Sequence, residues 1–570
     1  MVTFMDKIML RRFAIAVAGA VTLATMGSVR AAETALPDAA QAGNQAAVVA
    51  LIKQGADVNA TQGDAVTALH WAARRGDAAM TRALLVAGAN VRAATRLAAY
   101  TPLHLAAEHG SAEVITALVK GGADANARTT TGATPVMFAA GSGDVASVQA
   151  LIDAGADMNA AESYVGQTPM IYAAAANRVA VVKFLLARGA DPNKATKVVD
   201  LAALSKNGEN PEGRNLVEKK GAKPAAPRPG RVPVAGVERQ YMYNEQVQSQ
   251  GGMTPLHYAA RQGFADVAMA LLDAGVPVDQ RKADGATPLL IATVNGQFDL
   301  ALQLLDRHAD PNAAAENGAA PLYATVNLQW APRAGYPQPH AQLNQHVSYL
   351  DYMQRLLEKG ADPNQRLRKK VWYTGYNFDQ SGVDEVGATA FWRAAYGADV
   401  EAMQLLLKYG ADPTLSTVKP PERPEVGDAG RREMKDVSGV LPIPTGGPGV
   451  PPLLAAAGVG YGEGFAGNSH RFAPIGQLAA VKFLVEVVGA DVNARDHEGN
   501  TAMHHAASRG DVEMLKYLVS KGADPKLVNR EGETTLDMAN GPVQRVQPWP
   551  EAIAYLASLG VINNGRCLSC

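Results

Sequence analysis

Small and apolar residues recur along the chain in blocks of constant spacing. In one block, Thr101-Pro102-Leu103 opens a run that stops at Gly110. A threonine hydroxyl can cap the first turn of a helix, and proline suits the first helical position because its missing N–H costs nothing there. Glycine readily adopts the left-handed conformation that ends a helix. The pattern therefore predicts a short helix that begins at Pro102 and ends before Gly110.

A second helix in each block is predicted by apolar residues at helical spacing. Val145, Val148, Leu151 and Ile152 fall on one helical face, and Gly155 ends the run. Each block is therefore a predicted helical hairpin. One such hairpin cannot bury both of its apolar faces alone, so the sequence predicts a stack of hairpins that share a continuous core.

The blocks return with a period of about 33 residues. They begin at Thr67, Thr101, Thr134 and Thr168, at Thr254, Thr287 and Ala320, at Thr501 and Thr534, and, in degenerate form, at Thr389 and Pro451. This period and the Thr-Pro-Leu-His-x-Ala-Ala pattern resemble the ankyrin repeat over most of residues 33 to 560. The resemblance implies an all-α solenoid of about 11 helix-turn-helix repeats, with a partial N-terminal repeat and several loop insertions. It also implies a protein that binds another protein through the concave face and the inserted loops.

Alanine pairs mark the places where neighbouring hairpins are expected to pack closely. They stand at 72 and 73, 106 and 107, 139 and 140, 259 and 260, and 506 and 507. Because a small side chain lets two backbones approach, a larger residue at these positions is expected to overpack the stack.

Five insertions interrupt the period, and their positions predict which edge of the solenoid they decorate. Segments 197–252, 366–388 and 416–450 lie between repeats, whereas segments at about 328–346 and 458–477 lie within hairpins, at the opposite edge. The expected organisation is a leader at 1–31, repeats at 32–196, 253–415 and 451–560, linkers rich in Pro and Gly at 197–252 and 416–450, and a tail at 561–570. A basic run at 219–231 is interpreted as part of a solvated linker, or alternatively as a segment that attracts an acidic partner or an anionic surface.

Residues 1–31 have the organisation of a secretory signal peptide. Lys7, Arg11 and Arg12 precede an apolar run at 13–26, and Val29-Arg30-Ala31 offers a small-residue cleavage site. A membrane anchor is the alternative, although the uncharged stretch is at the lower limit of the spanning length. The mature protein is expected to be exported to the periplasm of a Gram-negative bacterium or beyond, without a stable membrane span, and to be monomeric.

The composition narrows the classes of partner. The chain has 47% hydrophobic and 19% charged residues, which is typical of an ordered protein, and its formal net charge is -1. A protein that binds nucleic acid leaves a basic footprint, so nucleic acid is not expected as a partner. Two cysteines cannot form a disulfide framework in a chain of this length.

Repeated histidines and aspartates resemble metal ligands or catalytic residues but are expected to have structural roles. The histidines are His70, His104, His257 and His504, and the aspartates of the Gly-Ala-Asp loops are Asp57, Asp124, Asp157, Asp191, Asp310, Asp362, Asp412, Asp491 and Asp524. Stacked helices lie about 8–10 Å apart, so histidines of successive repeats cannot share a zinc ion bound at about 2.0 Å. The resemblance implies that each imidazole bonds backbone between adjacent loops, and the aspartates are expected to stabilise turns. No catalytic motif is present, so no enzyme, metal site or cofactor is predicted.

Aromatic residues are concentrated between Tyr323 and Tyr409. Two interpretations remain open: the inserted loops form a local minicore, or they present rigid anchors to a partner. The second interpretation places the recognition surface at about 320–412, with 67–194 and 501–533 as support. Its candidate residues are Trp330, Tyr336, Trp372, Tyr373, Tyr376, Phe378 and Trp392.

The sequence Cys567-Leu568-Ser569-Cys570 is similar to the C-x-x-C-H motif of covalent haem attachment, without its histidine. An alternative function follows, in which the ankyrin array docks a redox partner for a C-terminal c-type cytochrome, with haem c on Cys567 and Cys570. A local redox pair and unpaired thiols are the other interpretations. A secreted effector that acts on a host protein is a third function that the architecture allows.

Overall fold

A computed structural model describes residues 34–206, 234–239, 241, 245–246, 249–330, 341–371, 383–421, 436–461, 473, 476–541 and 547–565. These residues form two compact units. The first unit comprises the described part of Met1–Lys197 with Met253–Ala259 and Asp266–Val276, and the second comprises the described parts of Val198–Gly252 and Pro277–Cys570 with Ala260–Ala265.

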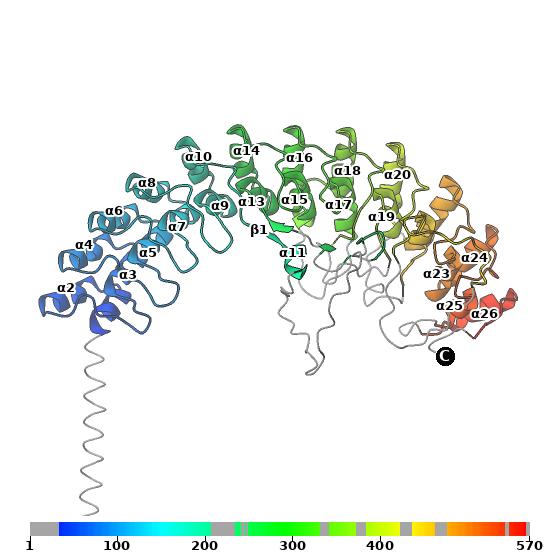
Figure 1. Cartoon of the computed structure of the whole chain (residues 1–570), viewed down its shortest axis with the longest axis horizontal. Coiled ribbons are helices and arrows are strands. Elements are labelled where there is room, and N and C mark those ends of the chain that lie inside the picture. The colour runs from blue at the N-terminus through cyan, green and yellow to red at the C-terminus, as the bar shows by residue number, and fades with distance from the viewer. Residues whose placement is uncertain are drawn as a thin grey trace, which may run out of the picture. The chain divides into compact units, whose positions relative to one another are not determined.

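The first unit is a row of helical hairpins (Figure 1). A helix at 34–41 pairs with α2 (Gln45–Lys53), and the next hairpins are α3 (Ala68–Arg74) with α4 (Ala78–Val86), α5 (Pro102–His109) with α6 (Ala112–Lys120), α7 (Pro135–Ser142) with α8 (Val145–Asp153), and α9 (Pro169–Ala175) with α10 (Val179–Ala187). Most of α13 (Pro255–Gln262) and α14 (Ala265–Asp273) also belongs to this unit. First helices pack on first helices and second helices on second helices.

The second unit repeats this arrangement. Its hairpins are α15 (Pro288–Val294) with α16 (Phe298–Asp306), α17 (Pro321–Gln329) with α18 (Tyr349–Glu358), α19 (Ala390–Tyr396) with α20 (Val400–Lys408), α21 (Pro452–Ala456) with α22 (Gly476–Phe483), α23 (Ala502–Ser508) with α24 (Val512–Ser520), and α25 (Thr535–Ala539) with α26 (Pro550–Ser558). A 3-10 helix, η1 (Ala341–Asn344), precedes α18, and a π-helical turn (Leu484–Val488) continues α22. The expected all-α solenoid is confirmed.

The helix ends follow from local chemistry. Thr101 is the N-cap of α5, Pro102 is its first residue, and Gly110 ends it with a φ of 80°. The alanine pairs are fully buried, Ala106 and Ala107 among them, so the neighbouring first helices approach closely. In the second helix α8, Val148 and Leu151 are fully buried.

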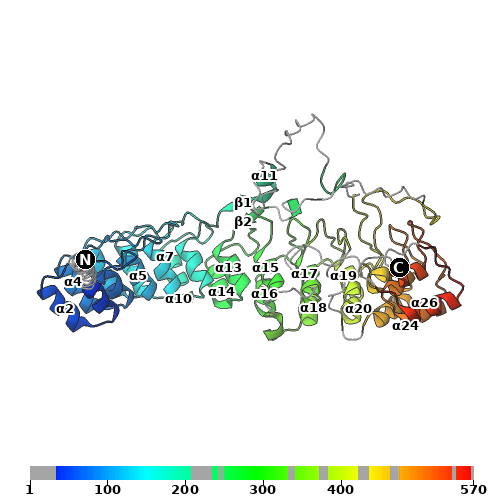
Figure 2. The ribbon, with the colours of Figure 1, turned by 90° about the horizontal axis from the view of Figure 1, so that it is seen from below.

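The loops between repeats are hairpins, here called fingers, that lie side by side. In the first unit the Thr130 amide donates to Ala98 O at 3.0 Å, and the Ser163 amide donates to Thr131 O at 2.7 Å. In the second unit the Arg530 amide donates to Glu498 O at 2.9 Å. In these cases a finger bonds through its backbone to the finger before it. Figure 2 shows the fingers of the second unit on one side of α15, α17 and α19, with α16, α18 and α20 on the other side.

The described ends of the three insertions between repeats form the stems of fingers. β1 (Val198–Asp200) and β2 (Ser249–Gly251) form an antiparallel stem in which Val198 pairs with Gly251, and α11 (Leu201–Lys206) follows β1. A second stem is closed by Leu367, whose amide donates to Ala388 O at 3.0 Å, and a third by Thr417, whose amide donates to Val450 O at 3.1 Å. These described ends lie at the finger edge, where the sequence predicts them.

No helix in the described ranges is long and apolar enough to cross a membrane. The proposed signal peptide at 1–31 lies outside those ranges.

Candidate protein-binding surface

The repeated histidines join adjacent repeats. In α5 the Thr101 amide donates to His104 Nδ1 at 3.2 Å, and His104 Nε2 lies 3.3 Å from Ala133 O in the next finger. His504 makes the same two contacts with Thr501 and with Glu533 O, and His70 Nε2 reaches Tyr100 O at 3.1 Å. The expected backbone bonds are confirmed for these three histidines.

The pKa values of these rings keep them neutral. Burial lowers the pKa of His104 to about 4, against an opposing effect of its bond to Ala133 O. Burial, followed by the neighbouring His505, lowers the pKa of His504 to about 4. In the tautomer that carries its proton on Nε2, a neutral ring accepts at Nδ1 and donates at Nε2, which is what both contacts need. Within the described part of the chain, no group of three or more His, Cys, Asp or Glu residues is placed to hold a metal ion.

The aspartates of the Gly-Ala-Asp loops stabilise turns, as predicted. Each accepts a hydrogen bond from the backbone amide two residues later at 2.8 or 2.9 Å. Sequence reasoning missed the asparagine that follows. Asn126 Oδ1 accepts from the Asp157 amide at 2.9 Å, and its Nδ2 donates to Gly155 O at 2.8 Å, so the side chain links two repeats. Asn312, Asn364 and Asn493 form equivalent links.

Two of the predicted partner-binding residues lie in the core of the second unit. Trp392 is fully buried, and its Nε1 donates to Val450 O at 2.8 Å. Trp330 is 7% exposed, and its Nε1 donates to Asp399 Oδ2 at 2.7 Å. These indoles are therefore not available to a partner, in contrast to the expectation, because both find their hydrogen-bond acceptors inside the fold.

A polar network surrounds Trp330. Arg393, which is 1% exposed, donates from Nε to Asn327 Oδ1 at 2.7 Å and from Nη2 to Trp330 O at 2.8 Å. Tyr349 donates to the same Asp399 oxygen at 2.8 Å. Burial, then the charge of Asp399, raises the pKa of Tyr349, so its hydroxyl stays protonated and remains a donor. These aromatic and polar contacts form a local core around Trp330. The minicore interpretation of the inserted loop concerns residues 372–378, which lie outside the described ranges.

The other predicted residues lie outside the described ranges. They are Tyr336, Trp372, Tyr373, Tyr376 and Phe378, together with Cys567 and Cys570.

An apolar row that sequence reasoning missed runs along the first helices of the first unit. It consists of Trp71, Leu105, Phe138 and Tyr172, each four residues after the threonine cap and each half-buried. The ring centroids of Phe138 and Tyr172 are 6.5 Å apart. The signal that could have found the row is its constant spacing from the cap.

The same position is buried in parts of the second unit, where Arg393 and His505 occupy it. His505 Nε2 lies 3.4 Å from Asp496 Oδ2, and both side chains are buried. The first unit therefore differs from these repeats in leaving an apolar row partly open to solvent.

The fingers of the first unit carry three exposed large apolar side chains. Leu97 is 74% exposed, Tyr164 is 81% exposed and Val165 is 39% exposed. The finger that carries Tyr164 is held by the buried Glu162 carboxylate, which accepts from the amides of Tyr164, Val165 and Gln167 at 2.5, 2.8 and 2.9 Å. The tyrosine is thus presented on a well-ordered loop.

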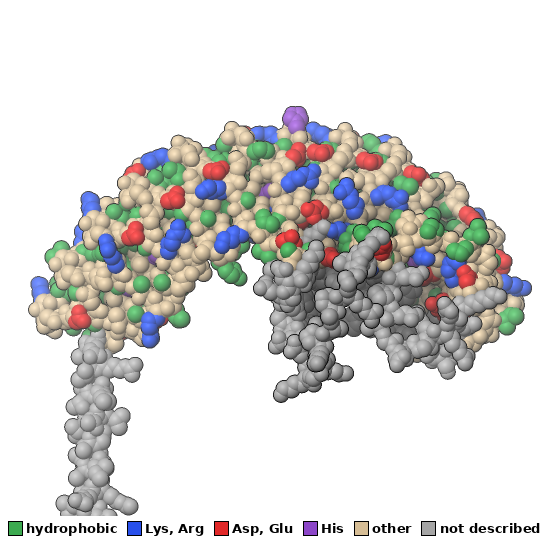
Figure 3. Space-filling view, viewed as in Figure 1, with side chains coloured by type: hydrophobic (Ala, Val, Ile, Leu, Met, Phe, Trp, Pro, Cys, Tyr) green, Lys and Arg blue, Asp and Glu red, His purple; other side chains and the backbone are tan. Residues whose placement is uncertain are grey.

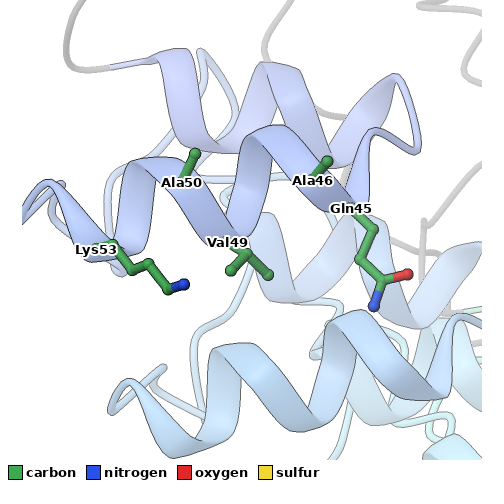
Figure 4. Close-up of a pocket in the computed structure, with 5 residues that line it drawn as sticks. All are labelled: Gln45, Ala46, Val49, Ala50 and Lys53. Atoms are coloured by element: carbon green, nitrogen blue, oxygen red, sulfur yellow. The ribbon is translucent and has the colours of Figure 1, made fainter.

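Two other surface features do not define a site. A shallow hollow on α2 is lined by Gln45, Ala46, Val49, Ala50 and Lys53 (Figure 4). It lacks the convergent polar groups of a small-molecule site. Basic and acidic side chains are interspersed over the visible face of each unit and form no single-sign patch there (Figure 3).

Stacked helical hairpins, capped by threonine and joined by fingers, define a helical repeat protein. Models of ankyrin repeats match residues 36–129, 103–196 and 235–315, and a second ankyrin model matches residues 470–519. Together these matches cover about half of the chain. The chain belongs to the ankyrin-repeat family.

Known relatives match over single stretches of repeats. Alpha-latrocrustotoxin-Lt1a from Latrodectus tredecimguttatus is 40% identical over 88 residues, which are 15% of this chain and 6% of the toxin. Protein phosphatase 1 regulatory subunit 27 from Homo sapiens is 39% identical over 69 residues, which are 12% of this chain and 44% of that protein. The chain thus spans less than half the length of these relatives. The crystal structure of the human ASB11 ankyrin repeat domain matches with 26% identity over 48% of this chain and 98% of that chain, with a TM-score of 0.35.

Proposed function

We propose that the protein is a non-enzymatic scaffold that binds a protein partner through the first helices and fingers of its first unit. Ankyrin repeats are protein-interaction modules and are generally without enzymatic activity. The observation that carries the proposal is the half-buried row of Trp71, Leu105, Phe138 and Tyr172, together with the exposed Tyr164 on a finger of the same unit. Tyrosine and tryptophan are the residues most enriched in interface hot spots, because they bury a large area at low cost in conformational entropy.

The inserted loops are proposed as a second part of this binding function. Trp372, Tyr373, Tyr376 and Phe378 support this part through their residue types. The partner is proposed to be a protein of the bacterial envelope, because residues 1–31 have the organisation of a signal peptide. The scaffold is proposed to be periplasmic or secreted and to act as a monomer without a cofactor.

The test begins with a partner captured from periplasmic extract by cross-linking to the mature protein. Tyr164→Ala and Tyr172→Ala are each expected to weaken binding about thirty-fold, the equivalent of a hot-spot residue worth about 2 kcal/mol. Val86→Ala is the matched control, because Val86 is 90% exposed on the second helix α4, away from the row. Undiminished binding by both tyrosine variants would exclude the row. Trp372→Ala with Tyr376→Ala tests the inserted loop in the same assay.

Electron transfer is a second candidate function, favoured by Cys567-Leu568-Ser569-Cys570. Cys567 and Cys570 are the two thiols of a haem-attachment motif, and the histidine that would bind the iron is not part of Cys567–Cys570. Covalent haem staining of the product expressed from the natural gene separates this function from the scaffold.

A further inference from the structure

The fingers of the last repeats of the second unit hold an extended segment of the same chain. Residues 436–441, here called the docked segment, lie against the fingers at 495–500 and 528–533. Arg530 Nη1 donates to the Asp436 carboxylate and to Val440 O at 3.2 Å, and Nη2 donates to Leu441 O at 2.7 Å. Arg495 Nη1 lies 3.3 Å from Ser438 O. Two arginines from successive fingers therefore bind this segment mainly through its backbone carbonyls.

Both guanidinium groups are fixed by the repeats before they contact the segment. Arg530 Nε donates to His497 O at 2.8 Å, and Arg495 Nη1 donates to Val528 O at 3.0 Å. The planar guanidinium carries its donors in a rigid fork, so fixing one edge orients the others. The N–H donors of both arginines are thus oriented to bind carbonyl and carboxylate oxygens.

The docked segment has the properties of a bound peptide and not of core. It has no helix or strand, and Val437 and Leu441 are 58% and 83% exposed. Asp436 Oδ1 accepts from the Ser438 amide at 2.9 Å and from its hydroxyl at 2.6 Å, which forms a local turn. The contacts that hold the segment are therefore polar, few and directed at main-chain groups.

We propose that Arg495 and Arg530 form a binding site for an extended peptide with Asp two residues before Ser, and that residues 436–441 fill this site as an intramolecular ligand. A partner protein with such a segment would replace the docked segment. This inference does not rest on the surface proposed for the first unit, because it uses other repeats and recognises main-chain oxygens in place of apolar contact.

The connection within the chain explains why the site is filled in the isolated protein. The docked segment is linked through a few residues to the finger stem, where Val418 bridges to Pro448. This connection is itself held to the stem, because Lys419 Nζ donates to Ile443 O at 2.9 Å and the Gly446 amide donates to Lys419 O at 2.9 Å. A short connection gives an effective concentration on the order of millimolar or more. A peptide in solution must therefore compete with a ligand that is always close, and the intramolecular contact must be weakened before binding in trans can be measured.

The experiment uses the full chain with Asp436→Lys, which repels the docked segment from Arg530 at a side chain that is 38% exposed. The probe is a fluorescent peptide with the sequence of residues 436–443, and the readout is anisotropy. We expect at least ten-fold tighter binding to this variant than to the natural chain. A peptide with Lys at its first position is the control and is expected not to bind.

Charge reversal supplies an independent measurement. Elastase is expected to cut next to Val437 or Leu441 faster in Asp436→Lys. Arg530→Glu added to that variant is expected to restore the natural cleavage rate only in part, because the glutamate can pair with the introduced lysine but cannot donate to Val440 O and Leu441 O. Equal cleavage of Asp436→Lys and the natural chain would overturn the proposal, because the arginine contacts would then not hold the segment. Faster cleavage without any gain in peptide binding would overturn it as well.

Discussion

At the scale of single residues, one histidine can stabilise two repeats. The ring of His104 accepts from the Thr101 amide and reaches Ala133 O in the next finger, and both contacts need the neutral ring. The pKa of this ring is about 4 in the fold, chiefly because it is buried, whereas an exposed histidine in the unfolded chain has a pKa near 6.5. The unfolded chain therefore binds more protons between these pH values. The stabilisation of the fold by the neutral histidine is complete above pH 6.5 and is lost as the pH falls towards 4.

This difference predicts acid sensitivity. For each such histidine, the free energy of unfolding is expected to fall by up to about 3 kcal/mol as the pH falls from 7 to below 4. His104→Met introduces the side chain that stands at the equivalent position 137, where Met137 Sδ lies 3.5 Å from the Thr134 amide. The variant is expected to be less stable than the natural chain at pH 7. Its free energy of unfolding is expected to fall less on acidification than that of the natural chain. Urea unfolding at pH 7 and pH 4.5 measures both quantities, and equal losses in the two proteins would refute the linkage.

At the scale of elements, helices were predictable and the docking of insertions was not. The start of α5 at Pro102 follows from residues within one turn, so the sequence alone places it. The docked segment depends on a contact between Asp436 and Arg530, which are 94 residues apart, and no periodic pattern signals such a pair. For the same reason the burial of Trp330 escaped prediction, because its acceptor Asp399 is 69 residues away.

The asparagine links make a prediction at this scale. Asn126→Ala removes two hydrogen bonds to the next repeat, at Asp157 N and Gly155 O, and leaves those backbone groups to water. We expect the free energy of unfolding to fall by about 1–2 kcal/mol, which follows from the usual net contribution of a hydrogen bond. Asn193→Ala is the matched control, because Asn193 has the same place in its loop but no side-chain bond of this kind among the described residues. Similar losses in both variants, measured by urea unfolding, would rule out the link.

At the scale of the whole molecule, stability is a sum of local terms. Within each unit, the helix pairs with the most extensive contacts are hairpin partners or neighbours in the same row, so a perturbation has no direct route to distant repeats. The repeat period made this architecture predictable from the sequence. The apolar row was not recognised, because the exposure of Phe138 or Arg393 depends on the residues that adjacent repeats place beside it.

Ala107→Leu tests this locality. Ala107 is fully buried between first helices, so the larger side chain is expected to cost about 1–3 kcal/mol by overpacking. Amide hydrogen exchange is expected to accelerate in α3, α5 and α7 and to stay unchanged in α23 to α26. Ala79→Leu, at an exposed position of α4, is expected to leave exchange unchanged throughout. Acceleration that reached α23 would show long-range cooperativity instead.

The finger stems give this chain an unusual freedom to acquire new segments. Val198 pairs with Gly251, and Thr417 bonds to Val450, so each insertion leaves and re-enters the stack at adjacent points. Doubling the length of a flexible loop adds only about 0.6 kcal/mol of closure entropy. Evolution can therefore lengthen, exchange or recombine such insertions while the repeats beneath them keep their contacts. A foreign domain whose termini lie close together could be grafted onto the same stem as cargo.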